Sequence, residues 1–240
     1  MNEYNNYYSW EIAKFYDLIT SNGYYDYEKL ARIIKSILGN RRKILEVGIG
    51  TGNIAIPLAK QGFDVDGIDL SWPMLNIARE KVISEGLEIG LYRQDCSELN
   101  LPFKYDAVLS HGGVPVYIRG REGLIFESYL PTLEENYKAL QNVFHHLERN
   151  GRFIVNVQKD HEAQETLALG DNLYYWSSVE YSGDFIRKTH YVTSGDEILM
   201  EQTFDIRRFS KKTIDDVLNE IGFRVLGEDK TGSFYVMEVN

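Results

Sequence analysis

The chain has 240 residues, of which 43% are hydrophobic and 26% charged, and its formal net charge is −10. This length is large for one domain and sufficient to bury a substantial core. The acidic balance argues against a nucleic-acid partner, because a large nucleic-acid footprint usually shows as an excess of Lys and Arg. The single cysteine, Cys96, excludes an internal disulfide.

Neither the first residues nor the histidines indicate a membrane, a secretion signal or a metal. No apolar run approaches the ~20 residues that cross a bilayer. The opening MNEYNNYYSW is polar and aromatic, without the basic start and apolar core of a signal peptide. We therefore expect a cytoplasmic protein without a membrane partner. The five histidines never fall at the i, i+4 spacing of a helical metal site, so no metal is predicted.

The first 39 residues are predicted to form two cap helices. One lies within residues 1–20 and carries many aromatic side chains. The other covers residues 26–38, where apolar residues recur at helical spacing and Gly39 follows as a stop signal.

From residue 43 onward, strands and helices alternate. The predicted strands cover residues 43–47, 64–68, 87–94, 105–110 and 152–158. The predicted helices cover residues 52–61, 73–85 and 132–149, the last starting with a capping box of Thr132 and Glu135. This order predicts an α/β fold with a Rossmann-like, mostly parallel sheet and helices on both faces.

The alternation stops after residue 172, where three strand-like runs follow one another. They cover residues 173–181, 185–194 and 197–209, and Ser-Gly-Asp stands in both gaps, as tight turns require. We predict an antiparallel three-strand meander inserted over residues 173–209. A helix over residues 210–221 then leads back to the sheet.

The last two predicted strands, 223–226 and 234–239, are separated by only seven residues. A parallel crossover needs about a dozen or more, so these two strands are expected to be antiparallel. The prediction for residues 1–240 is therefore one domain with a seven-stranded sheet and one reversed strand at the end.

The segment 112–131 shows no clear periodicity and is predicted to be a long loop, of the kind that often forms a lid. Three glycines in it could act as hinges. Arg119 and Arg121 are candidates to meet an anionic acceptor, although exposed arginines without a ligand are the commoner case.

Three glycines stand at alternate positions where the first predicted strand meets a helix: Gly48, Gly50 and Gly52. A glycine turn there brings backbone N–H groups and a helix N-terminus to a ligand, and the absence of Cβ lets the ligand approach closely. The segment 50–55 also fits the dinucleotide pattern G-x-G-x-x-A. A tight turn without a ligand is the alternative.

Two acidic residues end the next two predicted strands, Asp69 and Asp95. Ligands of open α/β sheets bind outside the carboxyl ends of the strands, so both carboxylates are expected at the crevice that the glycines border. A helix cap or a loop turn is the alternative for each one.

Three stretches, EVGIGTG at 46–52, GIDLS at 67–71 and RQDC at 93–96, resemble the class I S-adenosylmethionine-dependent methyltransferases. The resemblance covers roughly residues 40–160 and 222–239. It includes the reversed last strand, which separates this family from NAD-dependent Rossmann enzymes. It implies S-adenosyl-L-methionine as cofactor.

The resemblance also implies roles for particular positions. Glu46 and the three glycines would hold the methionine part of the cofactor, and Asp69 would accept the ribose hydroxyls. The adenine would meet Leu70, Trp72, Asp95 and the Cys96 amide. Ser110 and His111 would contact the methionine end and the acceptor, and Tyr16, in the stretch FYD, would close over the cofactor.

The expected reaction is methyl transfer to nitrogen or oxygen of a small-molecule acceptor. His111 and Tyr16 are the candidate catalytic residues, His111 as a base. Aromatic faces can stabilise a sulfonium, and the candidates are Tyr7, Tyr8, Trp10 and Tyr16.

Two other activities stay open: methyl transfer to RNA or protein, and cofactor binding without catalysis. The stretch SHGG at 110–113 replaces the Asn-Pro-Pro-Tyr of many nucleic-acid base methylators. Similar small-molecule methyltransferases lay extra strands over the site or dimerise through them, so the meander, with Tyr174, Tyr175 and Trp176, is assigned to one of these roles. A homodimer remains open.

Overall fold

The computed structural model describes residues 8–22, 25–112, 115–121, 123–159 and 164–240. Its helices are α1 (Trp10–Ser21), α2 (Tyr27–Leu38), α3 (Ala55–Lys60), α4 (Trp72–Ser84), the 3₁₀ turn η1 (Cys96–Glu98), α5 (Leu133–His146) and α6 (Lys211–Ile221). The strands of the central sheet are β1 (Lys43–Val47), β2 (Asp64–Asp69), β3 (Gly90–Arg93), β4 (Tyr105–Ser110), β7 (Leu147–Lys159), β12 (Phe223–Glu228) and β13 (Phe234–Val239).

The central sheet has the strand order β3-β2-β1-β4-β7-β13-β12. The strands from β3 to β7 are parallel, and β13 runs antiparallel to both of its neighbours, β7 and β12. The predicted seven-stranded, mostly parallel sheet with its last strand reversed is confirmed.

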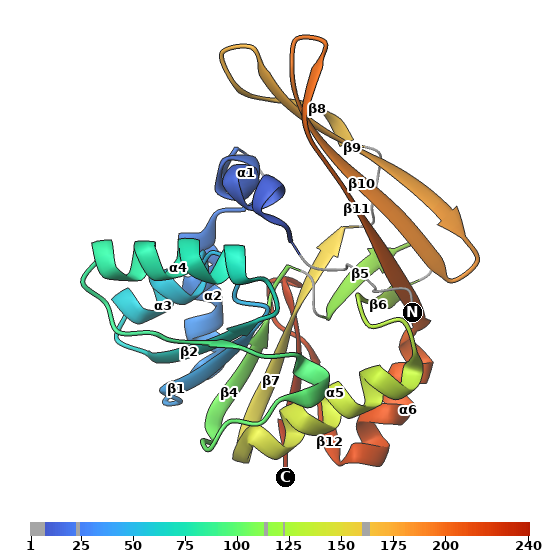
Figure 1. Cartoon of the computed structure of the whole chain (residues 1–240). Coiled ribbons are helices and arrows are strands. Elements are labelled where there is room, and N and C mark those ends of the chain that lie inside the picture. The colour runs from blue at the N-terminus through green and yellow to red at the C-terminus, as the bar shows by residue number, and fades with distance from the viewer. Residues whose placement is uncertain (1–7, 23–24, 113–114, 122, 160–163) are drawn as a thin grey trace.

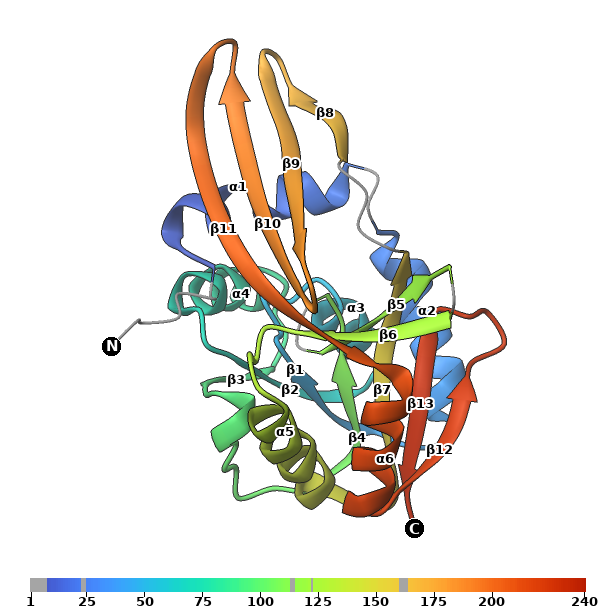
Figure 2. The same ribbon diagram turned by 90° about the vertical axis from the view of Figure 1, so that its right-hand side faces the viewer.

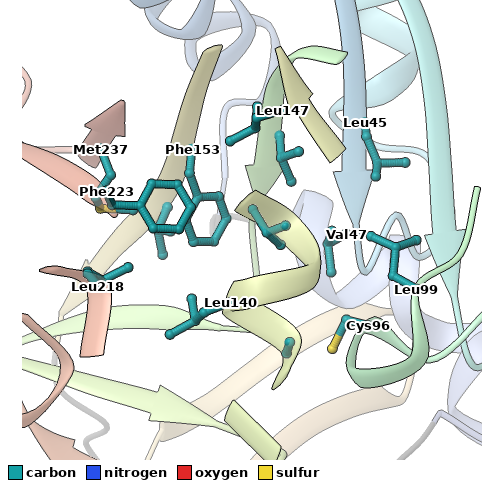
Figure 3. Packing of buried hydrophobic residues seen from close by; sticks show 14 of the residues in the cluster. Leu45, Val47, Cys96, Leu99, Leu140, Leu147, Phe153, Leu218, Phe223 and Met237 are labelled. Carbon is teal, nitrogen blue, oxygen red and sulfur yellow. The ribbon is translucent and has the colours of Figure 1, made fainter. Parts of the chain in front are cut away.

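Helices cover both faces of this sheet (Figure 1). On one face α2, α3 and α4 pack through residues such as Ile34, Leu58 and Leu75. On the other face α5 and α6 pack against Phe153 and Phe223, whose ring centroids lie 6.0 Å apart (Figure 3). The apolar side chains that alternate along the strands therefore fill two separate core layers.

The segment predicted to be a long loop contains a hairpin instead. Strands β5 (Val116–Gly120) and β6 (Gly123–Ser128) pair antiparallel, with Ile118 opposite Ile125. Val116, Tyr117 and Ile118 are all buried, so the run lacks the apolar–polar alternation that identifies a half-buried strand. Arg119, proposed to meet an anionic acceptor, instead pairs with Glu228.

The inserted meander has one strand more than predicted. Its strands are β8 (Gln164–Gly170), β9 (Leu173–Ser182), β10 (Phe185–Ser194) and β11 (Glu197–Ser210). β11 pairs with β6, β5 pairs with the upper end of β7, and the meander is thereby hydrogen-bonded to the central sheet. It projects away from the helices that cover that sheet (Figures 1 and 2).

Helix α1 lies between the meander and α4 (Figure 2). Its Ile12 and Ile19 pack in a third apolar cluster with Tyr175, Val192 and Phe204 of the meander. The part of the predicted first helix before residue 8, including Tyr7, lies outside the described residues. Within the described part of the chain, we find no helix with the length and apolar character of a membrane span.

Candidate functional site

A cavity of about 220 Å³ opens at the carboxyl ends of β1 and β2. Its wall is formed by Tyr8, Tyr16, Val47, Gly48, Gly50, Ile68, Asp69, Leu70, Met74, Gln94, Asp95, Cys96, His111, Gly112, Tyr129, Leu130, Pro131 and Glu135. Nine of the residues proposed from the sequence to bind the cofactor or to act in catalysis therefore meet at one place: Tyr8, Tyr16, Gly48, Gly50, Asp69, Leu70, Asp95, Cys96 and His111.

The glycine turn borders this cavity in a left-handed backbone conformation. The φ angles of Gly48, Gly50 and Gly52 are 74°, 55° and 81°, a region that residues with a Cβ rarely occupy. The amides of Gly48 and Ile49 both donate to the Ile68 carbonyl at 2.9 Å, which fixes the turn to β2. A Cβ added at Gly50 would meet no atom within 4 Å, so that side of the turn is open to a ligand.

Asp69 is held in place by the turn and by the next helix. Its carboxylate accepts hydrogen bonds from the amides of Gly50 and Ser71, each at 2.8 Å. Burial raises the pKa of Asp69, and these backbone hydrogen bonds act in the opposite direction. The carboxylate is thus oriented before any ligand arrives.

Asp95 and Cys96 enter the wall from the turn after β3. Asp95 accepts from the amide and the hydroxyl of Ser97, at 2.7 and 2.8 Å, and so caps the η1 turn. Burial raises the pKa of the Cys96 thiol to about 12, which keeps it neutral. The side chain of Asn142 donates to the Cys96 carbonyl at 3.2 Å and connects this turn to α5.

Four predicted site residues lie outside the cavity wall. Glu46 is only 2% exposed, and its Oε2 has no hydrogen-bond partner among the described residues. Ser110 donates to the Pro115 carbonyl at 2.7 Å. Gly52 faces Ile56 and Ala78 within the protein, and Trp72 is 46% exposed under the Arg79 guanidinium.

Three tyrosines, two from the N-terminal region and one that follows β6, lie together at the cavity. Tyr8 and Tyr16 meet edge to face with ring centroids 5.3 Å apart. The hydroxyl of Tyr8 is also hydrogen-bonded to that of Tyr129, which follows β6. Burial raises the pKa of all three hydroxyls, so they remain protonated. Trp10, the other described aromatic candidate, is 49% exposed and not part of the wall.

His111 follows β4 directly and is half-buried. Its ring contacts Tyr25 and Tyr27, with centroids 4.7 and 6.0 Å away. Its Nε2 is buried and has no hydrogen-bond partner within the described structure. Desolvation lowers the pKa of His111 to about 4, so the imidazole is neutral at pH 7 and can accept a hydrogen bond.

Tyr129, Leu130 and Pro131 belong to the segment 112–131 that was predicted to form a lid, but none of the three was singled out, and Met74 and Gln94 were not predicted as site residues. Glu135 was identified only as part of the capping box, which the structure confirms: its amide donates to the Thr132 hydroxyl at 3.2 Å. That box fixes the start of α5 next to the cavity. It was the one local signal for this part of the site.

A second cavity of about 100 Å³ adjoins the first one. Its wall is formed by Tyr8, Ile12, Tyr16, Ile19, Thr20, Tyr25, Gly112, Tyr129, Gln158, Tyr175, Lys188, His190 and Ile206. Tyr8, Tyr16, Gly112 and Tyr129 line both cavities. Of the predicted meander aromatics, Tyr175 faces this cavity, whereas Tyr174 and Trp176 are not in its wall.

Comparisons with known proteins agree with this geometry. A family model described as a methyltransferase domain matches residues 44–151. A Bacillus subtilis protein, provisionally named methyltransferase YqeM, is 28% identical to this chain. The match covers 89% of this chain and 85% of the Bacillus protein.

Two solved structures share the fold over nearly the whole chain. CalS10 from Micromonospora echinaspora, an amino pentose methyltransferase solved with S-adenosylmethionine, is 17% identical, with a TM-score of 0.74 and coverage of 98% and 99% of the two chains. DesVI from Streptomyces venezuelae is 22% identical, with a TM-score of 0.74 and coverage of 97% and 99%. The chain therefore carries a methyltransferase domain over residues 44–151 and shares its fold with S-adenosylmethionine-dependent methyltransferases.

Proposed function

We propose that this enzyme transfers a methyl group from S-adenosylmethionine to nitrogen or oxygen of a small-molecule acceptor. The observation that carries the proposal is the pair of adjoining cavities that share Tyr8, Tyr16, Gly112 and Tyr129. The first cavity would hold the cofactor and the second the acceptor, and the shared residues would surround the point where the two meet.

The wall of the first cavity fits the cofactor. Gly48 and Gly50 offer backbone without Cβ to the methionine part, and the open space beside Gly50 leaves room for it. Asp69 offers an oriented carboxylate to the ribose hydroxyls. Asp95 and the Cys96 amide offer an acceptor and a donor to the adenine edge, as the family resemblance implies.

Glu46 is proposed to act from behind the glycine turn. Its carboxylate accepts a hydrogen bond from the Ala55 amide at the start of α3. Burial, together with the charge of Asp69, raises the pKa of Glu46. The raised pKa favours the neutral acid, whereas an ammonium group bound nearby would favour the ionised form, so Glu46 is proposed to respond to the methionine end of the cofactor.

When bound, S-adenosylmethionine supplies an activated methyl group on a positively charged sulfur. The tyrosines at the cavity present neutral rings, and aromatic faces stabilise a nearby cation by roughly 0.5–2 kcal/mol each. They also exclude water from the region that both cavities share. Alignment of two bound reactants can lower a barrier by up to ~7–11 kcal/mol, so placement is the main contribution expected of this protein.

His111 is proposed to orient the attacking atom. Because its imidazole is neutral at pH 7, it adds no positive charge beside a cationic cofactor. Its buried Nε2 can accept a hydrogen bond from an N–H or O–H of the acceptor, which directs a lone pair away from that proton. An amine acceptor suits this arrangement, and an amino pentose is the acceptor class named for CalS10.

The proposal is tested by incubating the enzyme with S-adenosylmethionine and a panel of small amines and alcohols. Mass spectrometry would detect each product as a gain of one methyl group, and calorimetry with S-adenosylhomocysteine would establish cofactor binding separately. Methylation of tRNA or of protein substrates, with none of any small molecule, would contradict the proposal.

A further inference from the structure

Lys188 is the one charged side chain among the described residues that line the second cavity. It lies on β10, where residues alternate between the two faces of the meander. His190, two positions further, lines the same cavity, whereas Arg187 lies on the opposite, exposed face and pairs with Asp205 at 2.8 Å. The strand therefore directs one cation into the cavity and its neighbour to solvent.

The acid whose charge acts on Lys188, Glu127, also pairs with a second cation. Glu127, on β6, is 1% exposed and forms an ion pair with Arg208 at 3.0 Å. Burial lowers the pKa of Lys188, and the charge of Glu127 raises it. Lys188 thus lines the cavity near a carboxylate that also pairs with Arg208, and an anion in the cavity would add a counter-charge on the side that faces it.

Polar groups accompany Lys188 in the same wall. The Tyr175 hydroxyl and His190 Nδ1 are hydrogen-bonded at 2.8 Å, and Gln158 lies at the upper part of β7. Lys188 lines only the second cavity and His111 only the first, with the shared tyrosines between them. The cation Lys188 lies at one end of the two adjoining cavities, and the hydrogen-bond acceptor His111 lies at the other. A methyl-accepting substrate could therefore contact Lys188 with one end and His111 with the other.

We propose that Lys188 binds an anionic group, a carboxylate or a phosphate, of the methyl acceptor. This inference rests on the proposed function and narrows its acceptor class to small amines or alcohols that carry such a group. The anionic group pairs with Lys188 in the second cavity, and the nucleophilic nitrogen or oxygen points toward Tyr16 and His111. Lys188 is thus a specificity-determining residue.

Three variants separate the charge of Lys188 from its bulk. K188Q removes the charge, K188R keeps it, and R187Q removes the neighbouring charge from the outer face as a matched control. S-adenosylhomocysteine is first titrated into each protein by calorimetry. Equal affinities in all four proteins establish that the cofactor cavity is intact.

The probes are ethanolamine, phosphoethanolamine and glycine, together with glucosamine and glucosamine 6-phosphate. The two pairs, ethanolamine with phosphoethanolamine and glucosamine with glucosamine 6-phosphate, compare an amine without and with a phosphate. Glycine is the amine that carries a carboxylate. Melting temperatures are measured with saturating S-adenosylhomocysteine, and methyl transfer is measured with S-adenosylmethionine. We expect the anionic probes alone to stabilise wild type and K188R, and which of them do so distinguishes carboxylate from phosphate.

A charged hydrogen bond contributes about 1.5–3 kcal/mol. K188Q should therefore raise the KM for an anionic probe that the wild-type enzyme methylates by about 10- to 150-fold. R187Q should leave it unchanged. Equal turnover of charged and uncharged amines, or anion binding unaffected by K188Q, would overturn the inference while leaving methyl transfer intact. The absence of a Lys188-dependent shift with every anionic probe would also overturn it.

Discussion

The carboxylate of Asp17 on α1 accepts a hydrogen bond from the hydroxyl of Thr51 in the glycine turn, at 2.5 Å. The same carboxylate accepts hydrogen bonds from the side-chain amide of Asn53 and from the ammonium group of Lys81 on α4, each at 2.9 Å. Asp17 directly follows Tyr16, which lines both cavities. One side chain therefore fastens the helix beside the site to the turn assigned to the cofactor.

The first prediction is that Asp17→Asn weakens cofactor binding. Losing these contacts, at about 0.5–1.5 kcal/mol each, should free α1 and raise the Kd of S-adenosylhomocysteine by about tenfold, measured by calorimetry. Glu11→Gln, the same change at an exposed position of α1, is the control. Equal affinities for the two variants would show that Asp17 does not hold the site together.

The second prediction concerns pH. The pKa of His111 is about 4 in the folded protein and about 6.5 in an unfolded chain. Between these values the unfolded chain holds a proton that the folded one does not, so the free energy of unfolding should rise with pH. Allowing for the partial exposure of the ring, we expect His111 to add about 1–2 kcal/mol to the free energy of unfolding as the pH rises from 4 to 6.5.

His111→Gln removes that contribution, so the difference in unfolding free energy between wild type and variant should change between pH 4 and pH 6.5 and stay constant above it. Urea unfolding at several pH values measures it. A constant difference across the whole range would mean that His111 titrates normally in the folded protein.

The third prediction separates the ring of Tyr16 from its hydroxyl. Only S-adenosylmethionine carries the sulfonium charge, and S-adenosylhomocysteine lacks it. If the ring stabilises a cation, Tyr16→Ala should weaken binding of the charged ligand more than that of the neutral one, by roughly 2- to 30-fold. Tyr16→Phe keeps the ring and should preserve the ratio. If Tyr16→Ala leaves the ratio of the two dissociation constants, for S-adenosylmethionine and S-adenosylhomocysteine, unchanged, Tyr16 serves only in packing.

The fourth prediction concerns stability at Gly67 in β2. A Cβ at this position would lie 2.2 Å from Ile49 Cδ1, and such overpacking typically costs 1–3 kcal/mol. Gly67→Ala should lower the free energy of unfolding by about that amount and disturb the turn that contains Ile49. Gly170→Ala is the control, since a Cβ there meets no atom within 4 Å. Chemical unfolding of both variants measures the difference.

The positions of Asp69 and Asp95 could be anticipated because parallel strands bring their carboxyl ends to one edge of a sheet. The reversed last strand could be anticipated because seven residues are too few for a crossover. Both inferences use only short stretches and a general property of sheets. The local pattern was therefore sufficient for the cofactor side of the site.

The sequence predicted a meander over the site or at a dimer interface, but most of the residues that line the second cavity could not be anticipated in this way. Tyr129 and Lys188 reach the site because β6 pairs with β11, where Phe126 lies opposite Phe209. No local pattern specifies a pairing between strands so far apart in the sequence. Glu46 was expected at the ligand, but its neighbours Leu45 and Val47 point into the core layer under α5, so strand alternation directs it to the other face.

The double pairing of β7 constrains how this enzyme can diverge. Its lower part belongs to the central sheet, and its upper part pairs with β5, through which the meander is attached. The meander is therefore not an exchangeable accessory: removing it would take the partner β11 from β6, which is joined through β5 to the strand at the centre of the molecule. Variation in acceptor preference is expected to accumulate in side chains along the inner face of β10, while the framework that presents them stays constant.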